Sequence, residues 1–316
     1  MKTKHFKGAL LSTLIIVSLI APAFSIISLL SVGTVSAQVQ IYENTIRAKD
    51  NAYNVNTPGG LGPWKKYDND PATPYESRPV LMAVARHYEG KVAAASFIDA
   101  CRNDKWNYFA SEFPYLNYLL DATFKWLSGK SSQPIKVLWY EGPTAPMPTG
   151  RVYNTMFTGG TSGTVQCSQL RDNLQNDPHF NYSTNLTYST DSVITSALLD
   201  PYDVVVIPQL EEGDGKWGGD PEGVENSEVT ALENYVRNGG GLLMFDGGDA
   251  NGYNFCYVDE KILKAFDNMG MFQQHDSVQD DVNNDGVNYA PYVVVENTGP
   301  GSIGDIYENN NPKKTE

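Results

Sequence analysis

The amino-acid sequence predicts an α/β protein in which helices cover both faces of a doubly wound, mostly parallel sheet. The first observation is a pair of apolar runs without polar alternation, residues 136–140 and 203–208, which is typical of strands buried on both faces. The second is that helical patterns lie between such runs, which implies right-handed crossover connections. The 316 residues are 41% hydrophobic, which is enough to bury a core and argues against wholesale disorder.

The chain before residue 130 is expected to form a hairpin and one helix. Residues 38–78 are rich in turn-forming residues and poor in pattern, so we expect an irregular N-terminal segment there. Apolar runs at 80–85 and 92–98 are separated by a Glu-Gly turn, which predicts a hairpin. Apolar side chains then recur at helical spacing over 114–127, and the pattern stops at Gly129.

The rest of the chain alternates between strand and helix patterns. Strands are expected at 136–140, 203–208 and 242–245, and helices at 165–174, 192–199, 227–238 and from Asp259 to residue 269. Three consecutive glycines, Gly239–Gly241, end the third of these helices. Asp259 is a typical N-cap residue ahead of the apolar positions of the last helix.

Residues 1–37 have the pattern of a secretory signal peptide. Three lysines precede a long apolar run, and the small residues Val35-Ser36-Ala37 follow at the spacing that a signal peptidase reads. Because the run is long, an uncleaved anchor is the alternative, and a membrane is an expected partner only if this segment is retained. In either case we expect an extracellular or cell-surface location, which suits the N-glycosylation sequons at Asn181 and Asn185.

Charge and cysteine content narrow the partners further. The formal net charge is −14 at pH 7, and removing the basic first 37 residues makes the remainder more acidic. Nucleic-acid binding needs clustered lysine and arginine, so we expect no nucleic-acid partner. The chain has three cysteines, so at most one disulfide can form within it, and the fold must depend on its hydrophobic core.

A short repeat links the two ends of the chain. The sequence Ile-Tyr-Glu-Asn occurs at 41–44 and again at 306–309, with lysines a few residues further on in each case. Coincidence is one interpretation. The other is that the chain ends where it began, so that the closing pieces of a domain, residues 80–98 and 114–128, precede its opening strand at residue 136. That order would be a circular permutation, or a window cut from a tandem array.

Three motifs carry a resemblance to a known family. They are Tyr-Asp-Val-Val-Val-Ile-Pro at 202–208, the helix-to-strand segment with three glycines at 228–243, and the polar segment at 276–284. With them, residues 135–296 resemble the glutamine-amidotransferase-like domains of archaeal and bacterial surface proteins. Those domains share the flavodoxin-like three-layer sandwich of the class I glutaminases and the trehalose-utilisation (ThuA-like) proteins.

Residues 79–129 look like the closing segment of the same domain type. The resemblance therefore implies one domain over 79–316, in which a closing hairpin and helix, 79–130, stand ahead of the main sheet, 135–316. It implies a fold more strongly than an activity, because the same scaffold serves many unrelated functions.

Glutaminase chemistry needs residues that this sequence lacks. A class I glutaminase uses a cysteine nucleophile on the turn after its central strand, a histidine and an acid. The matching turn here is 245–249, which contains no cysteine. The histidines beyond residue 37 do not stand in the context that the family uses; they are His87, His179 and His275. We therefore expect no glutaminase activity, no catalytic residue, and no nucleotide or organic cofactor.

Two cysteines follow predicted sheet strands. Cys101 comes after the strand at 92–98 and Cys256 after the strand at 242–245, so both are expected just beyond carboxyl ends of the sheet. A Cys101–Cys256 disulfide is the expectation for an extracellular protein, and buried thiols are the alternative. Cys167 is left outside that pair.

A ligand is expected at the carboxyl edge of the sheet, where long loops leave the core. The predicted rim combines carboxylates with an indole, so it suits a hard cation or a glycan. Its residues are Asp99, Glu211, Glu212, Trp217, Asp246 and Asp249. A solvated acidic surface is the alternative interpretation.

A calcium loop is the most specific short motif. Asp281, Asn283 and Asp285 stand at positions 1, 3 and 5 ahead of Gly286, as in the opening of an EF-hand loop. Position 12 is Tyr292 in place of a bidentate glutamate, so we expect Ca²⁺ to bind more weakly than in a full loop. A linear Asx-rich turn is the alternative.

Two function classes remain open from the sequence. The first is a non-catalytic extracellular domain for binding or assembly, with a cell-surface partner, a glycan or further copies of the chain as its partner. In a permuted chain the first segments could complete a neighbouring copy. The second is a secreted hydrolase or carbohydrate-active enzyme that uses acidic residues at the carboxyl edge of the sheet.

Overall fold

The computed structural model has its described elements in one compact unit, Gln40–Glu316. The structure describes residues 42–48, 53–55, 80–97, 101, 103, 113–131, 134–141, 167–176, 184–189, 191, 193–208, 224–245, 256–266, 277–279, 282 and 293–310. Within these residues, no helix combines the length and the apolar character needed to cross a membrane.

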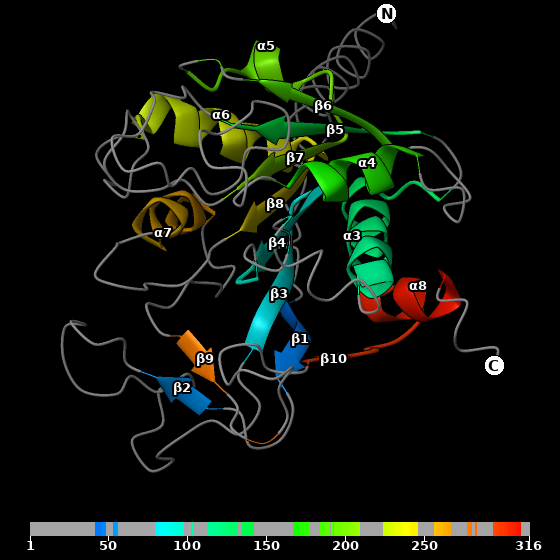
Figure 1. Cartoon of the computed structure of the whole chain (residues 1–316). Coiled ribbons are helices and arrows are strands. Elements are labelled where there is room, and N and C mark those ends of the chain that lie inside the picture. The colour runs from blue at the N-terminus through cyan, green and yellow to red at the C-terminus, as the bar shows by residue number, and fades with distance from the viewer. Residues whose placement is uncertain are drawn as a thin grey trace, which may run out of the picture. The chain divides into compact units, whose positions relative to one another are not determined.

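Eight strands form one mixed sheet in the order β10-β1-β3-β4-β8-β7-β5-β6 (Figure 1). Their bounds are β1 Tyr42–Ala48, β3 Val80–His87, β4 Gly90–Ala95, β5 Ile135–Tyr140, β6 Thr184–Ser189, β7 Val204–Ile207, β8 Gly241–Phe245 and β10 Val293–Val295. The strands from β4 to β6 in this order pair in parallel, and β3, β1 and β10 extend the sheet in antiparallel fashion. The separate pair β2 (Tyr53–Val55) and β9 (Ser277–Gln279) is antiparallel.

The parallel strands have the flavodoxin-like order in space, but one strand comes from a different place in the chain. A flavodoxin-like sheet has its strands in the order 2-1-3-4-5. If β5 is numbered as strand 1, then β6, β7 and β8 are strands 2, 3 and 4, and β4 occupies the position of strand 5 beside β8. Because β4 precedes β5 in the chain, the strand that closes the sheet comes first. The predicted doubly wound fold is confirmed, with its segments in permuted order.

Helices cover both faces of the sheet (Figure 1). On one face lie α3 (Phe113–Ser128), α4 (Ser168–Asn176) and α8 (Ile303–Asn310), whose apolar side chains belong to one core cluster. On the other face lie α5 (Ser196–Leu199), α6 (Asn226–Arg237) and α7 (Cys256–Ala265), whose side chains belong to a second cluster. The molecule therefore has three layers, with the sheet between two layers of helices.

Neighbouring residues of the central strands point to opposite clusters. In β5, Val137 and Trp139 pack with α3 and α4, whereas Leu138 and Tyr140 pack with α5 and α6. All four side chains are fully buried. A strand with both faces covered needs apolar residues at every position, which explains the unalternated runs that predicted it.

The prediction of an irregular segment over 38–78 is wrong for two parts of it. β1 pairs with both β3 and β10, and β2 pairs with β9. β1 has polar residues at most positions and changes register twice against β3, between Asn44 and Arg47. Such irregular pairing breaks the period-two pattern by which strands are recognised in sequences.

The two copies of the terminal repeat have different structures. Tyr42-Glu43-Asn44 lie in strand β1, whereas the same residues at 307–309 lie in helix α8. The repeat therefore does not mark a duplicated structural unit, because tertiary context decides the conformation of so short a sequence. The permutation stands on the strand order alone.

Two further predictions need correction, and one strand has no counterpart among the predicted elements. The expected helix at 192–199 is reduced to one turn, α5, which begins after Thr195; the hydroxyl of Thr195 accepts a hydrogen bond from the amide of Leu198 at 3.3 Å. Strand β6 was not predicted, because an edge strand can keep polar residues such as those of its sequence TNLTYS. Asp259 is not an N-cap, since α7 already begins at Cys256.

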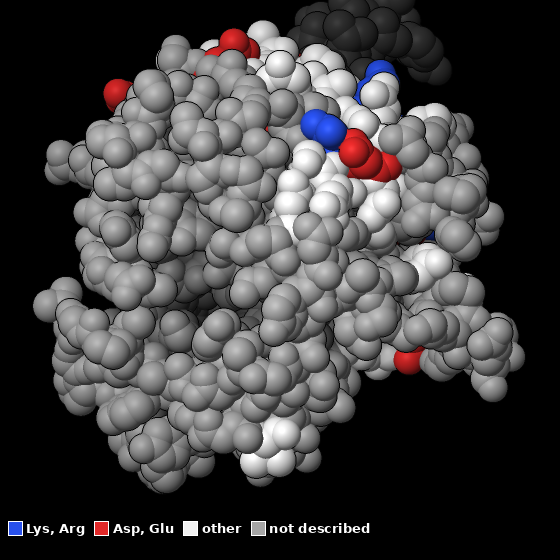
Figure 2. All heavy atoms as spheres, in the orientation of Figure 1, with Lys and Arg blue, Asp and Glu red and all other residues white. Residues whose placement is uncertain are grey.

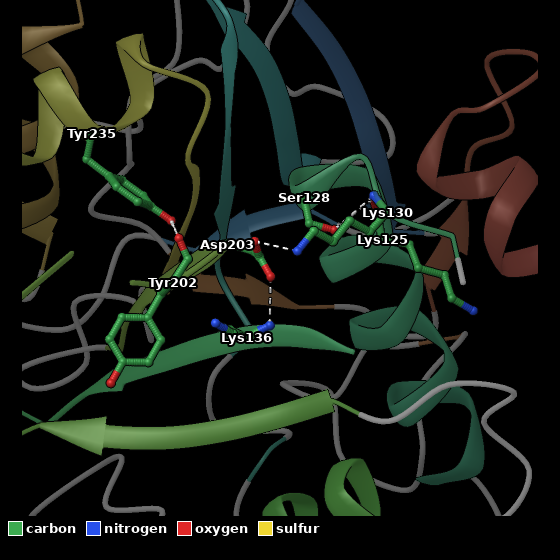
Figure 3. Close-up of polar contacts among 7 residues, drawn as sticks. All are labelled: Lys125, Ser128, Lys130, Lys136, Tyr202, Asp203 and Tyr235. Atoms are coloured by element: carbon green, nitrogen blue, oxygen red, sulfur yellow. Dashed lines mark hydrogen bonds and ion pairs between the residues drawn. The ribbon is translucent and has the colours of Figure 1, made fainter. Parts of the chain in front are cut away.

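The end of the closing segment is fixed to the amino edge of the parallel sheet (Figure 3). The ammonium of Lys130, which follows α3, lies 2.7 Å from Oδ1 of Asp203 at the start of β7. Oδ2 of Asp203 accepts a hydrogen bond from the amide of Lys136 at 2.9 Å. One carboxylate thus joins the closing segment to β5 and β7.

The β3–β4 turn is fixed to helix α6 in the same way. Nε2 of the buried His87 lies 3.0 Å from Oε1 of Glu233, which also accepts a hydrogen bond from Nε of Arg237 at 2.8 Å. The Arg237 guanidinium stacks on the ring of Tyr88, 4.2 Å from its centroid. Burial of the Glu233 carboxylate opposes its ionisation, but the hydrogen bonds from His87 and Arg237 outweigh that effect and lower its pKa.

Lys91 of β4 is a partly buried cation at the end of α3. Its ammonium donates a hydrogen bond to the carbonyl of Trp126 and lies 5.1 Å from the centroid of that indole ring. The Arg86 guanidinium lies 5.9 Å from the same ring. Burial, followed by the positive charge of Arg86, lowers the pKa of Lys91 to about 8.

We expect the free energy of unfolding to depend on the ionisation of Lys91 at alkaline pH. Between the folded pKa of about 8 and the ordinary value of 10.5, the unfolded chain binds more protons, so stability gained through Lys91 rises with pH. The wild-type chain should therefore gain stability relative to Lys91→Met between pH 8 and pH 10.5. Urea denaturation of both proteins checks this, and parallel pH profiles would show that the pKa of Lys91 is not lowered.

Candidate functional site

The candidate site lies at the point where the sheet changes winding direction. From β5 the chain passes through α4 to β6 on one side, then through α5 to β7 on the other side. α4 and α5 lie on opposite faces of the sheet. Ligands of open α/β sheets bind outside the carboxyl ends of the strands at such a switch point.

The phenol of Tyr140 stands at the carboxyl end of β5. Its hydroxyl donates a hydrogen bond to the carbonyl of Asp191 at 2.6 Å, and its side chain is fully buried. Burial raises the pKa of Tyr140 well above its usual value, with smaller contributions from the charges of Glu228 and Asp191. Tyr140 is therefore a neutral hydrogen-bond donor at neutral pH.

Glu141 follows Tyr140 and is also buried, with 6% of its surface exposed. Its amide donates a hydrogen bond to the carbonyl of Ser189 at 2.9 Å, which extends the β5–β6 pairing by one residue. Glu141 is the last described residue at the carboxyl end of β5, before the segment 142–166.

Glu228 in the first turn of α6 is the most buried carboxylate of this edge. It is fully buried, and its two oxygens accept hydrogen bonds from two backbone amides, that of Ile194 at 2.8 Å and that of Glu225 at 3.0 Å. The second bond is half of a capping box that satisfies the helix N-terminus. Through these two hydrogen bonds Glu228 joins the start of α6 to the chain ahead of α5, beneath the candidate site.

The loop residues predicted to bind ligands lie outside the described residues. This holds for Asp99, Glu211, Glu212, Trp217, Asp246 and Asp249, and for the calcium-loop residues Asp281, Asn283 and Asp285. Glu211, Glu212 and Trp217 follow β7 in the sequence, and β7 is the neighbour of β5 in the sheet. In the part of the chain that is described, no three His, Cys, Asp or Glu side chains gather into a metal site.

One of the two predicted glycosylation sites is described. Asn185 lies in the edge strand β6 with its side chain exposed, whereas Asn181 is outside the described residues. The exposed amide of Asn185 is therefore sterically available for modification.

The predicted Cys101–Cys256 disulfide stays a prediction, because the side chain of Cys256 lies outside the described part of the structure. Cys101 is fully buried in the core cluster of the α3 and α4 face. Cys256 begins α7, whose described apolar residues pack on the opposite face. The sequence showed that both cysteines follow strands, but it could not show that the chain turns to different faces after β4 and β8.

Sequence reasoning did not single out Tyr140, Glu141 or Glu228 as site residues. Tyr140 ends a predicted strand, Glu141 begins the loop after it at the carboxyl edge, and Glu228 belongs to a helix motif of the family resemblance. The spacing of Glu225 and Glu228 is a sequence signal for the role of Glu228, because an acid at the N3 position of a helix is typical of a capping box.

Acidic charge is not gathered into one patch over the described part of the face in Figure 2. Basic side-chain atoms lie directly beside acidic ones there. The excess negative charge of the chain, −14 in total, is therefore not expressed as a single-sign surface by the side chains described on that face.

Comparisons with known proteins find little that is similar. No family model and no curated protein matches the chain. Two solved structures match: IMPa from Pseudomonas aeruginosa in complex with an O-glycopeptide, at 11% identity and a TM-score of 0.35, and the IMPa metallopeptidase from the same organism, at 11% and 0.33. The matches cover 71% and 70% of this chain but only 20% and 18% of those chains, and at this level they carry no argument about function.

Proposed function

We propose that this chain is a non-catalytic extracellular or cell-surface domain for binding or assembly, with its ligand site at the β5–β7 switch point. The position of the switch point is the observation that carries the proposal. There, two neighbouring parallel strands end side by side, and two long segments of the chain, 142–166 and 209–223, begin.

The chemistry of the described residues favours binding over catalysis. Both oxygens of Glu228 accept hydrogen bonds from backbone amides, and the Tyr140 hydroxyl donates a hydrogen bond to a backbone carbonyl. These groups support the site rather than react in it. The turn after β8 carries Asp246-Gly247-Gly248 where the class I glutaminases, which the sequence resembles, carry their cysteine nucleophile.

The proposed ligand is a glycan or another surface component, with Ca²⁺ as a supporting ion. Trp217 supplies an indole face on which a sugar can stack, and Glu211 and Glu212 supply acceptors for its hydroxyl groups. Asp281, Asn283 and Asp285 are the proposed Ca²⁺ ligands, because carboxylate and amide oxygens suit a hard cation.

A glycan array probed with and without Ca²⁺ tests the proposal. We expect Trp217→Ala to weaken binding of any captured glycan at least tenfold, a loss of about 1.4 kcal/mol of binding free energy. Tyr88→Ala is the matched control, because Tyr88 is an exposed aromatic residue in the β3–β4 turn, at the amino edge of the parallel strands and so opposite the switch point. Its binding should equal that of the wild type.

The same samples distinguish the alternatives. The double variant Asp281→Asn with Asp285→Asn should lose any rise in melting temperature caused by Ca²⁺, whereas Asp172→Asn, an exposed acid on α4, should keep it.

Hydrolysis of a captured glycan would contradict the non-catalytic proposal and favour the hydrolase. Sedimentation of the chain over a range of concentrations tests self-assembly, which a monomer at every concentration would exclude.

A further inference from the structure

Two cations stand side by side on the β3–β4 hairpin. Arg86 and Lys91 are register partners in this antiparallel pair, so their side chains leave the same face of the sheet with Cβ atoms about 5 Å apart. Both charged groups approach the indole of Trp126 in α3. The Arg86 guanidinium lies 5.9 Å from the ring centroid and the Lys91 ammonium 5.1 Å. The two positive charges are therefore directed to one small region.

Within the described residues, neither Arg86 nor Lys91 has an acidic partner. Burial and then the positive charge of Arg86 lower the pKa of Lys91, and no carboxylate opposes them. Like charges directly opposite each other on neighbouring strands are destabilising. This pair is therefore uncompensated in a chain whose acids outnumber its bases, 37 to 23. Nearby cations do have acidic partners: Lys125 pairs with Asp121, Lys130 with Asp203 and Arg237 with Glu233.

Both side chains keep hydrogen-bond donors for a further group. The Lys91 ammonium has three N–H donors, of which one is directed to the carbonyl of Trp126. The contact of the Arg86 guanidinium with the indole is a cation–π contact, which uses none of its N–H groups. Arg86 is exposed and Lys91 is half-buried, so a ligand from solvent reaches the pair and meets one partly desolvated charge. Lower local polarity strengthens the attraction between opposite charges.

A capping role explains only one of the two cations. Lys91 binds a carbonyl in the last turn of α3, which ends at Ser128, and cations are favourable at a helix C-terminus. That role does not need a second cation opposite Lys91. The pair lies near the start of β4, which runs parallel to β8, and therefore at the amino edge of the parallel strands. The switch point is at the opposite edge, so the two places are separate.

We propose that Arg86 and Lys91 form a binding site for a phosphate group. Near neutral pH such a group carries close to two negative charges, which balance the two cations. The planar guanidinium can donate to two phosphate oxygens, and the ammonium supplies a compact charge with its own donors beside it. A free ion and a phosphate ester on a sugar present the same oxygens. The site goes beyond the proposed function and does not depend on it.

Titration of the Lys91 ammonium by NMR tests the site. The full chain, with carbon-13-labelled lysine, is titrated from neutral to alkaline pH in sodium chloride and in inorganic phosphate of the same ionic strength. Lys91→Met identifies the Lys91 signal. We expect phosphate to raise the pKa of Lys91 from about 8 toward its ordinary value of 10.5, because a nearby negative charge favours the ammonium. A lysine that only caps α3 would not respond, so an unchanged pKa at every phosphate concentration would overturn the proposal.

A matched pair of arginine variants tests the second cation. The phosphate dependence of the Lys91 signal gives the affinity, and circular dichroism confirms that each variant is folded. Arg86→Gln should weaken phosphate binding at least about tenfold, because it removes a charge-assisted hydrogen-bond donor. Arg171→Gln is the control, since Arg171 already pairs with Asp172 on α4, and its affinity should equal that of the wild type. Equal affinity of Arg86→Gln and the wild type would contradict the site.

A hexose monophosphate distinguishes the two sources of the phosphate group. Tighter binding of this ester than of inorganic phosphate would support the site with a phosphorylated sugar as its ligand. Equal or weaker binding would support the site with the free ion as its ligand. The unmodified hexose should leave the Lys91 signal unchanged. A response to the hexose as large as the response to its phosphate ester would overturn the assignment.

Discussion

Gly90→Ala should destabilise the fold by about 3 kcal/mol, at the upper end of what overpacking costs. A Cβ atom on Gly90 would lie 1.9 Å from the carbonyl oxygen of Val236 and 2.5 Å from that of Gly240. Both neighbours are backbone atoms at the junction of α6 and β8, which cannot rotate away as a side chain can. The start of β4 would have to move away from α6 and β8.

Urea denaturation measures the effect directly. Glu89→Ala is the matched control, because Glu89 is the exposed neighbour of Gly90 in the same turn. A surface change of this kind is expected to stay within about 0.5 kcal/mol of the wild type. If Gly90→Ala were as stable as Glu89→Ala, the hairpin would not dock against α6 and β8 as the structure has it.

Glu228→Ala should cost about 3 kcal/mol of folding free energy. The substitution removes the acceptor of two hydrogen bonds and leaves the buried amide of Ile194 without its partner at the base of the switch point. It also removes the bond to the amide of Glu225 that caps α6. A buried donor left without a partner costs more free energy than a formed hydrogen bond contributes. The loss of stability is therefore large for a single fully buried side chain.

Two comparison variants separate the causes. Glu228→Gln keeps one carbonyl oxygen of similar reach, so its loss of stability in urea denaturation should be smaller than that of Glu228→Ala. Thr230→Ala changes an exposed residue two positions further along α6 and should have little effect. Equal stability of Glu228→Ala and Thr230→Ala would show that Glu228 does not hold this edge of the sheet.

The central strands could be predicted because burial on both faces forces apolar residues into every position. β5, β7 and β8 are strands of this kind, and the predicted bounds of each lie within one or two residues of those in the structure. β6 was missed because it is an edge strand with five polar or aromatic-polar residues around Leu186. β1 was missed because its register changes hide the period of the strand.

The permuted order of the strands was suggested by the sequence, but on a ground that the structure does not support. The tetrapeptide repeat suggested it for a reason that the structure does not support, since one copy is a strand and the other a helix. The strand order supports the same conclusion independently, through β4 beside β8. Contacts so distant in sequence leave no local pattern, and only the resemblance of residues 79–129 to a closing segment pointed to them.

The location of the candidate site in the fold could be predicted from the sequence, but the described residues that support it could not. The carboxyl edge follows from the alternation of strands and helices alone. Tyr140 could not be found, because its hydrogen-bond partner Asp191 is far away in sequence. The capping-box spacing predicts the bond from Glu228 to the amide of Glu225, but not its bond to the distant amide of Ile194. The face on which Cys101 lies was hidden for the same reason.

Zero-length cross-linking of mixed isotopes tests most directly whether the closing segment completes its own sheet. Equal amounts of unlabelled and nitrogen-15-labelled chains are unfolded, refolded together and treated with a carbodiimide, which joins the ammonium of Lys130 to the carboxylate of Asp203, 2.7 Å apart. A domain closed on itself gives linked peptides that are entirely light or entirely heavy. Linked peptides with one light and one heavy member, in the proportion expected from random exchange, would contradict the account and show that neighbouring chains complete one another.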